Sequence, residues 1–139
     1  MGIAISTDKT KLDVPMIQAF LNNSYWAKDR TLKQIELSIE HSICFGMYLG
    51  DEQIGFARVS SDLGVHAYIM DVFIVESARG KGHAKELMQY ILDHELFTEV
   101  DYWFLGTKDA HGLYAQFGFE TLTTPRRYMK KCIVPDFLP

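Results

Sequence analysis

The sequence has no apolar run near the roughly 20 residues that a membrane-spanning helix needs. It also lacks an excess of positive charge, since 14 Lys and Arg stand against 18 Asp and Glu, a net charge of −4. A nucleic-acid binder usually carries a basic field, so we expect neither a nucleic-acid partner nor a membrane partner. The start of the chain does not have the basic-then-apolar layout of a secretion signal, and we expect a cytoplasmic protein.

Cysteine is scarce, and the spacing of Cys44 and Cys132 fits no metal-binding motif. We therefore expect no metal ion, and we interpret both thiols as free packing residues in a reducing compartment. Repeats, low-complexity segments and linkers are absent as well. A chain of 139 residues, 47% of them hydrophobic, is long enough to bury a core and predicts one domain over residues 1–139.

The N-terminal part predicts a short strand and two helices. Residues 3–6 are apolar enough for the strand. Asp13 can cap a helix over residues 14–22. The tetrapeptide 31–34 matches a capping box, T-x-x-Q, and predicts a second helix over residues 32–41. The apolar stripe of this helix is expected to consist of Leu32, Ile35 and Ile39.

The middle of the chain predicts mainly strands. Alternating apolar residues over 43–58 predict a hairpin with its turn at 50–53. Residues 66–75 are nearly all apolar, which is typical of a strand covered on both faces. Helical spacing over 81–95 and a strand over 101–107 complete a β-α-β crossover.

In the C-terminal part, Asp109 can cap a helix that runs through Phe117 and is closed by Gly118. A final antiparallel pair of strands is then predicted over 119–124 and 126–134. The element order is β-α-α-β-β-β-α-β-α-β-β. The predicted fold class is a mixed α/β sheet, mostly antiparallel and flanked by helices.

The stretch VESARGKGHAKELM places two glycines and several basic side chains between a strand and a helix. Such helix starts bind anions, because unpaired N–H groups and the helix dipole favour negative charge. A Walker loop would need Ser or Thr after Lys81, and a Rossmann turn would need a small residue in place of Lys85. The stretch instead fits R-x-x-G-x-A through Arg79, Gly82 and Ala84. An ordinary turn with a solvated basic patch is the alternative.

With a second motif, this loop resembles a known family. The segment DVFIVESARGKGHAKELM is similar to the acetyl-CoA-binding segment of GNAT-type N-acetyltransferases, and DAHGLYAQFGF resembles the family pattern A-x-x-L-Y-x-x-x-G-F. The family often has Asn ahead of the Tyr, where Thr107, Lys108 and Asp109 stand here. The resemblance implies that the chain has the GNAT acyltransferase fold. It also implies that the chain is a member of a small, largely uncharacterised subgroup of that family.

The resemblance further implies an N-acetyltransferase in which an amine attacks acetyl-CoA directly in a ternary complex. Backbone N–H groups of the strand before the loop would polarise the thioester carbonyl, and Tyr114 would protonate the departing thiolate. A core tyrosine whose hydroxyl caps a helix or strand is the alternative for Tyr114. The implied cofactor-binding residues are Val72, Phe73, Ile74, Arg79, Gly80, Lys81, Gly82, His83 and Ala84.

An amine acceptor must also lose a proton, since a lysine-like amine is only about 0.1% neutral near pH 7.4. The candidate bases are Asp71, His66, His111 and Glu76. Asp71 stands out because an unpaired carboxylate is costly in an apolar strand, and we place it with Tyr114 among the catalytic residues. The alternative is a structural role, in which Asp71 partners a backbone group or Arg58.

The acceptor is expected to be a small-molecule or peptide amine. Tyr25 and Trp26 lie in a polar loop and are the predicted substrate contacts, although Trp26 could instead pack the first two helices onto the sheet. A homodimer is left open. Two rival functions are a non-catalytic acyl-CoA-binding or sensing module of the same fold and an unrelated phosphate-ligand binder.

Overall fold

A central sheet of five strands carries the fold, and the computed structural model describes residues 2–133. The strands lie side by side in chain order. They are β1 (Ile3–Ser6), β2 (Ile43–Leu49), β3 (Glu52–Ser61), β4 (His66–Ile74) and β5 (Tyr102–Leu105). Neighbouring strands are antiparallel, except that β4 and β5 run parallel. The predicted mixed, mostly antiparallel sheet with one crossover is therefore confirmed.

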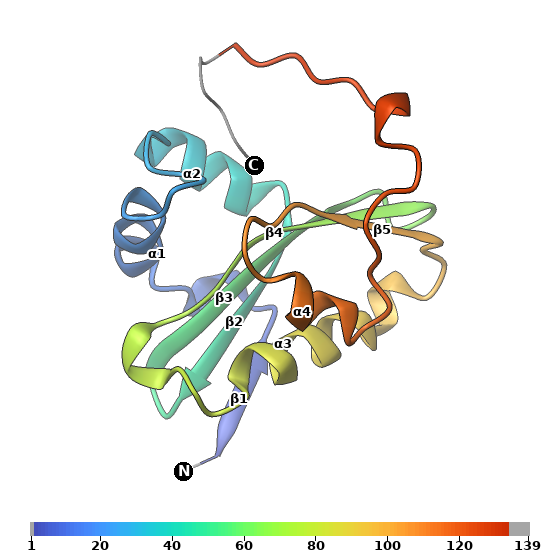
Figure 1. Cartoon of the computed structure of the whole chain (residues 1–139). Helices are drawn as coiled ribbons and strands as arrows, with labels where there is room; N and C mark the ends of the chain where they lie inside the picture. Colours follow the sequence, from blue (N-terminus) through green and yellow to red (C-terminus); the bar gives the residue numbers. More distant parts are fainter. Residues whose placement is uncertain (1, 134–139) are drawn as a thin grey trace.

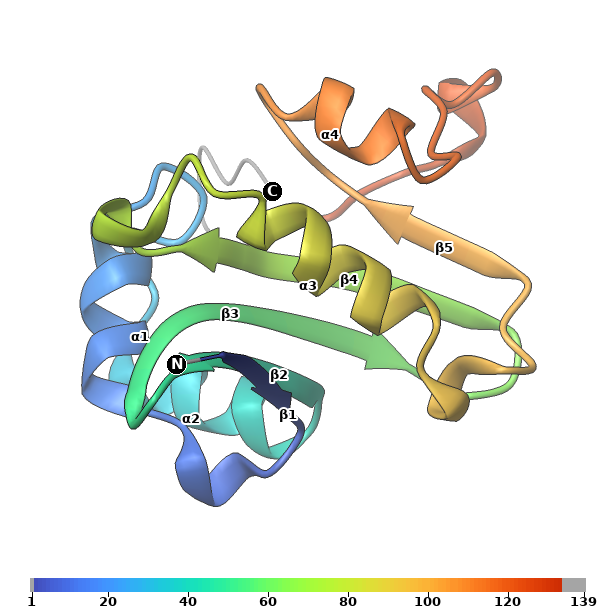
Figure 2. The ribbon, with the colours of Figure 1, turned by 90° about the horizontal axis from the view of Figure 1, so that it is seen from below.

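Helices cover both faces of this sheet (Figures 1 and 2). α1 (Val14–Asn22) and α2 (Leu32–Glu40) lie on one face, and α3 (His83–Leu92) lies on the other. Successive strand residues alternate between two cores, because side chains of a strand point to opposite faces. Phe45 packs with Leu87 under α3, whereas its neighbour Cys44 packs with the core under α1 and α2. The prediction that Cys44 is a packing residue is confirmed.

Both N-terminal helices begin where the sequence predicts. The Asp13 side chain accepts a hydrogen bond from the Met16 N–H, and both hydrogen bonds of the Thr31–Gln34 capping box are present. Ile35 and Ile39 are buried, but Leu32 is exposed and does not belong to the buried stripe. Leu32 opens the helix next to its cap, where the chain is still turning away from the core. Within residues 2–133, no helix combines the length and the apolar character needed to cross a membrane.

A β-bulge in β4 shapes the open end of the sheet. Phe56 pairs with Phe73 and Arg58 pairs with Met70, so two residues of β4 stand opposite one residue of β3. The first of these two is Asp71, whose φ is +56°. The pairing of β4 with β5 ends at Ile69 and Leu105, just before the bulge. Beyond this point β4 stays paired with β3 but no longer with β5, and its free side opens toward the start of α3.

Two helices are shorter than predicted. α3 begins at His83 rather than at residue 81, because Gly80 and Gly82 both have φ of +79°. It ends at Leu92, and a separate 3-10 turn follows. α4 covers only His111–Ala115, and Asp109 does not cap it, since Ala110 holds the N-cap position. Gly118 has φ of +88°, in accord with its predicted role after the helix.

The predicted final pair of strands is not present in the described residues. Segment 119–124 and the described part of 126–134 pair with no strand, and a 3-10 turn over Pro125–Arg127 interrupts them. Val134 lies outside the described residues. Cys132 is exposed, so its predicted packing role is wrong. A strand needs a neighbouring edge as well as a suitable sequence, and the described part of this segment pairs with no edge in residues 2–133.

Candidate functional site

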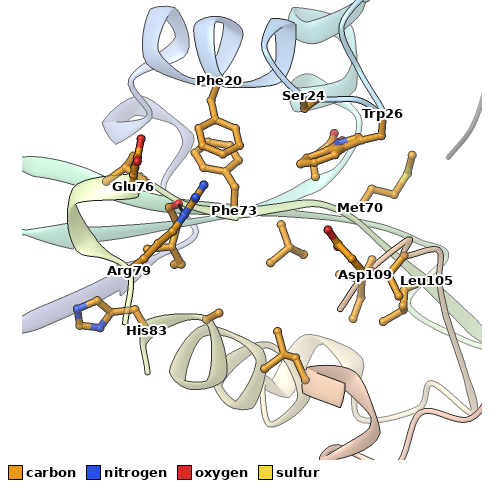
Figure 3. Close-up of a pocket in the computed structure, with 18 of the residues that line it drawn as sticks. Phe20, Ser24, Trp26, Met70, Phe73, Glu76, Arg79, His83, Leu105 and Asp109 are labelled. Atoms are coloured by element: carbon orange, nitrogen blue, oxygen red, sulfur yellow. Dashed lines mark hydrogen bonds between the residues drawn. The ribbon is translucent and has the colours of Figure 1, made fainter. Parts of the chain in front are cut away.

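A cleft of about 990 Å³ opens where β4 separates from β5. Its walls come from α1 and the loop after it, from β4 and the glycine loop, from the first turn of α3, and from the segment between β5 and α4. Figure 3 shows these side chains around one hollow, with Phe20 and Trp26 above β4 and His83 below it. The cleft gathers most of the predicted site residues, which are Tyr25, Trp26, Asp71, Val72, Phe73, Ile74, Arg79, Gly80, Gly82, His83, Ala84 and Tyr114.

The start of α3, at one end of the cleft, has the features that favour anion binding. Gly82 is the N-cap residue and has no side chain to cap the helix, and the first intrahelical bond runs from the Glu86 N–H to its carbonyl. The N–H groups of His83, Ala84 and Lys85 therefore have no intrahelical acceptor. A Cβ built on Gly80 or Gly82 would meet no atom within 4 Å. The loop thus leaves open space in front of a positive helix end.

The free stretch of β4 adds backbone donors. The Val75 N–H bonds to the Ile54 carbonyl across the ladder, so the Ile74 carbonyl of the same peptide points the other way and accepts Arg79 Nε at 3.0 Å. In an extended strand the N–H and C=O of one residue share a side. The N–H groups of Val72 and Ile74 are therefore directed away from β3, toward the cleft, whereas that of Phe73 faces β3.

The basic side chains of the loop do not all face the cleft. Arg79 turns back toward α1, with its guanidinium 6.0 Å from the centre of the Phe20 ring. Phe20 in turn stacks on Phe73 at 3.9 Å, which closes that wall of the cleft. Lys81 is exposed and is not among the lining residues, whereas Lys85, which we did not predict as a site residue, is. The direct positive charge at the helix start thus comes from Lys85 and the backbone.

Asp71 is the centre of a buried charge cluster. Its side chain is 1% exposed and accepts hydrogen bonds from Arg30 Nη1 at 2.8 and 2.7 Å, from Arg58 Nε at 2.9 Å and from Trp26 Nε1 at 3.0 Å. Arg58 also donates to Ser42 Oγ at 3.0 Å. Two guanidinium groups and the indole N–H thus occupy both oxygens of the carboxylate with charge-assisted and neutral hydrogen bonds. The geometry favours the structural interpretation of Asp71, with Arg58 as one of its partners.

Tyr25 and Trp26 hold the loop after α1 against the cleft in different ways. The Tyr25 hydroxyl accepts a hydrogen bond from the Lys108 N–H at 3.2 Å, and Lys108 Nζ lies 5.3 Å from the centre of the Tyr25 ring. Tyr25 thereby connects the two sides of the cleft. Trp26 packs against the core under α1 and α2 while its indole reaches Asp71. Trp26 thus has the packing role that was the alternative, and it also lines the cleft, whereas its contact with a substrate stays a prediction.

Tyr114 lies in the cleft wall on α4. Its ring packs edge-on against Phe119 with the centres 6.1 Å apart. In the described part of the chain its hydroxyl caps no helix or strand, and the residue lines the cleft. Burial raises the pKa of Tyr114 above its ordinary value of 10.0, and the neighbouring Tyr25 and Asp109 add to the effect. The phenol therefore keeps its proton throughout the neutral range.

The other candidate bases separate into two groups. His66 lies at the far end of β4, 3.4 Å from the Asp62 carboxylate, and neither it nor His111 lines the cleft. Glu76 does line the cleft, and so does Asp109, which the sequence suggested only as a helix cap. Arg30, which binds the Asp71 carboxylate, was not predicted as a residue of the site either. The lone carboxylate in an apolar strand predicted a cation nearby, but only the fold shows which cations reach it.

The pattern of the acetyltransferase (GNAT) family matches residues 14–119, a range that contains the whole cleft. The chain belongs to the GNAT family of acetyltransferases. The two motifs found in the sequence, the glycine loop and the segment around Tyr114, are thus two walls of the cleft of a GNAT protein.

Three known proteins illustrate the relationship. A solved GNAT-family structure from Xanthomonas campestris is 36% identical, with a TM-score of 0.93, and the match covers 99% of this chain and 97% of that one. A Gibberella zeae protein, provisionally named an acetyltransferase, is 27% identical over 107 residues, 63% of this chain, and the match spans 60% of its length. N-acetylglutamate synthase from Neisseria gonorrhoeae, solved with coenzyme A and N-acetyl-glutamate, shares the fold at 16% identity and a TM-score of 0.72, over 88% of this chain and 29% of that one.

The charge of Asp71 is expected to stabilise this GNAT fold. Asp71→Asn keeps the side-chain shape and the tolerance for positive φ, but it leaves two partly buried guanidinium groups without a counter-charge. We expect the free energy of unfolding to fall by about 3–5 kcal/mol in chemical denaturation. Asp101→Asn, which changes an exposed acid, is the control and should stay within about 0.5 kcal/mol. A fully stable Asp71→Asn that has lost turnover would instead make Asp71 the base.

Proposed function

We propose that this protein transfers the acetyl group of acetyl-CoA to an amine by direct attack in a ternary complex. The observation that carries the proposal is the cleft between β4 and β5, which has an uncapped helix start at one end and the Tyr114 side chain in its wall. Membership of the GNAT family supports acetyl transfer, and the coenzyme A bound in the Neisseria gonorrhoeae structure supports the choice of cofactor.

The residues present fit acetyl-CoA. Its pyrophosphate needs anion donors without side-chain obstruction, and the N–H groups of His83, Ala84 and Lys85 stand behind two glycines with open space before them. Lys85 adds a positive charge at the same end of the cleft. An elongated pantetheine arm can follow the free side of β4, where the N–H groups of Val72 and Ile74 are available. Acetyl-CoA supplies the acetyl group as a thioester.

The chain contributes three actions to the transfer. Backbone N–H groups of β4 stabilise the negative charge that develops on the carbonyl oxygen, an effect worth about 3–4 kcal/mol for one preorganised donor. The Tyr114 hydroxyl donates its proton to the departing thiolate, and its raised pKa keeps it protonated for this role. Glu76 or Asp109, the two carboxylates that line the cleft outside the Asp71 cluster, accepts the proton of the amine.

The loop after α1 forms the acceptor side of the site in this proposal. Tyr25, Trp26 and Phe20 supply aromatic surface there, and the two carboxylates favour a cationic amine. The Asp71 cluster holds the loop in place through Trp26 and Arg30 and does not itself take a proton. A small-molecule or peptide amine with an apolar portion is the acceptor class that these groups suit best.

The release of free thiol from acetyl-CoA, measured against a panel of amines, tests the function. Thiol release that depends on an amine supports an acetyltransferase and identifies the acceptor class. Tight acetyl-CoA binding without release by any amine would support a non-catalytic acyl-CoA sensor of the same fold. Tighter binding of ATP than of acetyl-CoA would overturn both interpretations.

Gly82→Val is expected to weaken acetyl-CoA binding at least about tenfold, because the new side chain fills the space in front of the helix start. The substitution also strains the backbone, since φ is +79°. Gly118→Val is the matched control: φ is +88°, the surrounding space is open and the residue lies outside the cleft. Calorimetry should show weaker binding in the first variant alone, with similar losses of Tm in both. Equal affinity in both variants would contradict the loop assignment.

Tyr114→Phe is expected to lower kcat about 10–10³-fold, with KM for acetyl-CoA nearly unchanged. The ring and its packing against Phe119 remain, and only the proton donor is lost. Since the wild-type phenol loses its proton only above pH 10, any alkaline fall in its rate that Tyr114 causes begins there and is absent in the variant. Tyr90→Phe, on the exposed side of α3, is the control for hydroxyl loss. Normal turnover by Tyr114→Phe would remove Tyr114 from the mechanism.

A further inference from the structure

The last described segment, residues 120–133, is an extended arm that does not belong to the sheet or to either core. Every one of these residues is exposed. Four of them are large and apolar, and their exposed fractions are 45% for Leu122, 54% for Tyr128, 96% for Met129 and 84% for Ile133. In Figure 1 the arm leaves α4, turns at Pro125–Arg127 and runs along the outside of the molecule toward the side of α2.

An arm of this kind needs a partner for energetic reasons. Fixing the backbone of a residue in one conformation costs conformational entropy, which its contacts must offset. In the described chain, the backbone N–H groups of the arm make two hydrogen bonds, both at the turn: Arg127 to Thr124 and Tyr128 to Pro125. One ring contact, Tyr128 against Phe104 with centres 5.9 Å apart, joins the arm to its own sheet. These contacts are too few to hold 14 residues in one conformation.

A surface that could receive the arm lies on β5. This strand is the edge of the sheet, and in the described residues its single strand partner is β4. Trp103 and Leu105 direct their N–H and C=O groups outward, because those of Tyr102 face β4 through its bond to the Val65 carbonyl. The Tyr102 side chain is 60% exposed. An unpaired edge with aromatic side chains is a template for another strand.

Charge complementarity indicates what this edge binds. The arm contains four Lys or Arg and one Glu, whereas residues 1–119 contain 10 Lys or Arg against 16 Asp or Glu. The arm is thus positive and the rest of the same chain is negative. Glu99 and Asp101 precede β5 and Asp109 follows it, and all three are exposed. The surface that suits this arm is therefore found on this protein itself.

We propose that two copies of this chain form a symmetric dimer by exchanging their arms, with residues 129–133 of each arm pairing with the outer edge of β5 in the other copy. Tyr128 already lies beside β5 of its own chain, so a two-fold axis nearby brings the two β5 edges together. Five extended residues span about 16 Å, enough to reach along the partner's strand. The similarity to the Xanthomonas campestris structure covers 99% of this chain and so takes in the arm.

Sedimentation equilibrium of the full chain tests the exchange, with one variant on each of the two surfaces. Met129→Asp with Ile133→Asp removes the apolar side chains of the arm, and Tyr102→Lys puts a positive charge on the edge that receives a positive arm. Each is expected to raise the dimer Kd at least about tenfold. The substituted side chains are exposed in the single chain, so the dissociated variants should still unfold in one cooperative transition. Tyr90→Lys, an exposed tyrosine on α3, is the matched control and should remain dimeric.

Each outcome decides the proposal. A dimer that both the arm variant and the edge variant dissociate supports the exchange. A monomeric wild type would overturn it, since the arm would then fold back on its own sheet or bind a different protein. A dimer that survives the arm substitutions would place the interface elsewhere. Loss of the dimer in the arm variant alone would show that the arm binds a surface other than β5.

Discussion

The buried carboxylate of Asp71 is the interaction on which the rest of the site depends. By strict alternation Asp71 would share the face of Ile69, under α3, where no cation could reach it. The bulge and the positive φ at Asp71 turn its side chain to the opposite face, where Arg58, Arg30 and Trp26 meet it. The same bulge bends β4, so the strand leaves β5 and the cleft opens. One local distortion thus creates the cavity and anchors the loop that covers it.

The cluster also explains why the two sides of the cleft are built differently. The cofactor side is local, because glycines with positive φ, an uncapped helix start and a free strand follow one another within 14 residues, from Val72 to Lys85. The acceptor side depends on contacts far apart in sequence: Arg30 and Trp26 reach Asp71, and Tyr25 reaches Lys108. A buried ion cluster gives little net stability over an apolar core, but it tolerates few alternative arrangements. It therefore suits a loop that must be held in one position.

This difference determines how much could be predicted from the sequence. The caps of the two N-terminal helices, the hairpin and the position of the glycine loop were predicted correctly because each signal lies within a few residues. The partners of Asp71 were only partly predicted, since Arg58 is one strand away but Arg30 comes from a loop 41 residues earlier. Asp109 was assigned to a cap on its residue type, and only the short α4 shows that its side chain faces the cleft. The final strands were predicted wrongly because a local stretch of sequence does not reveal whether a sheet edge is within reach.

The C-terminal segment has the sequence of a strand but does not form one in the described chain. Residues 119–133 combine strand-like apolar positions with four basic side chains, a composition that suits a strand next to an acidic edge. Within residues 2–133, β5 pairs with β4 alone and residues 120–133 are exposed, so strand propensity and fold disagree here. In a well-folded sequence such local and global preferences usually agree. In the proposed dimer a second copy removes the disagreement, because it supplies an edge with which the segment can pair. In that dimer the strand propensity of the C-terminal segment is satisfied between two chains rather than within one.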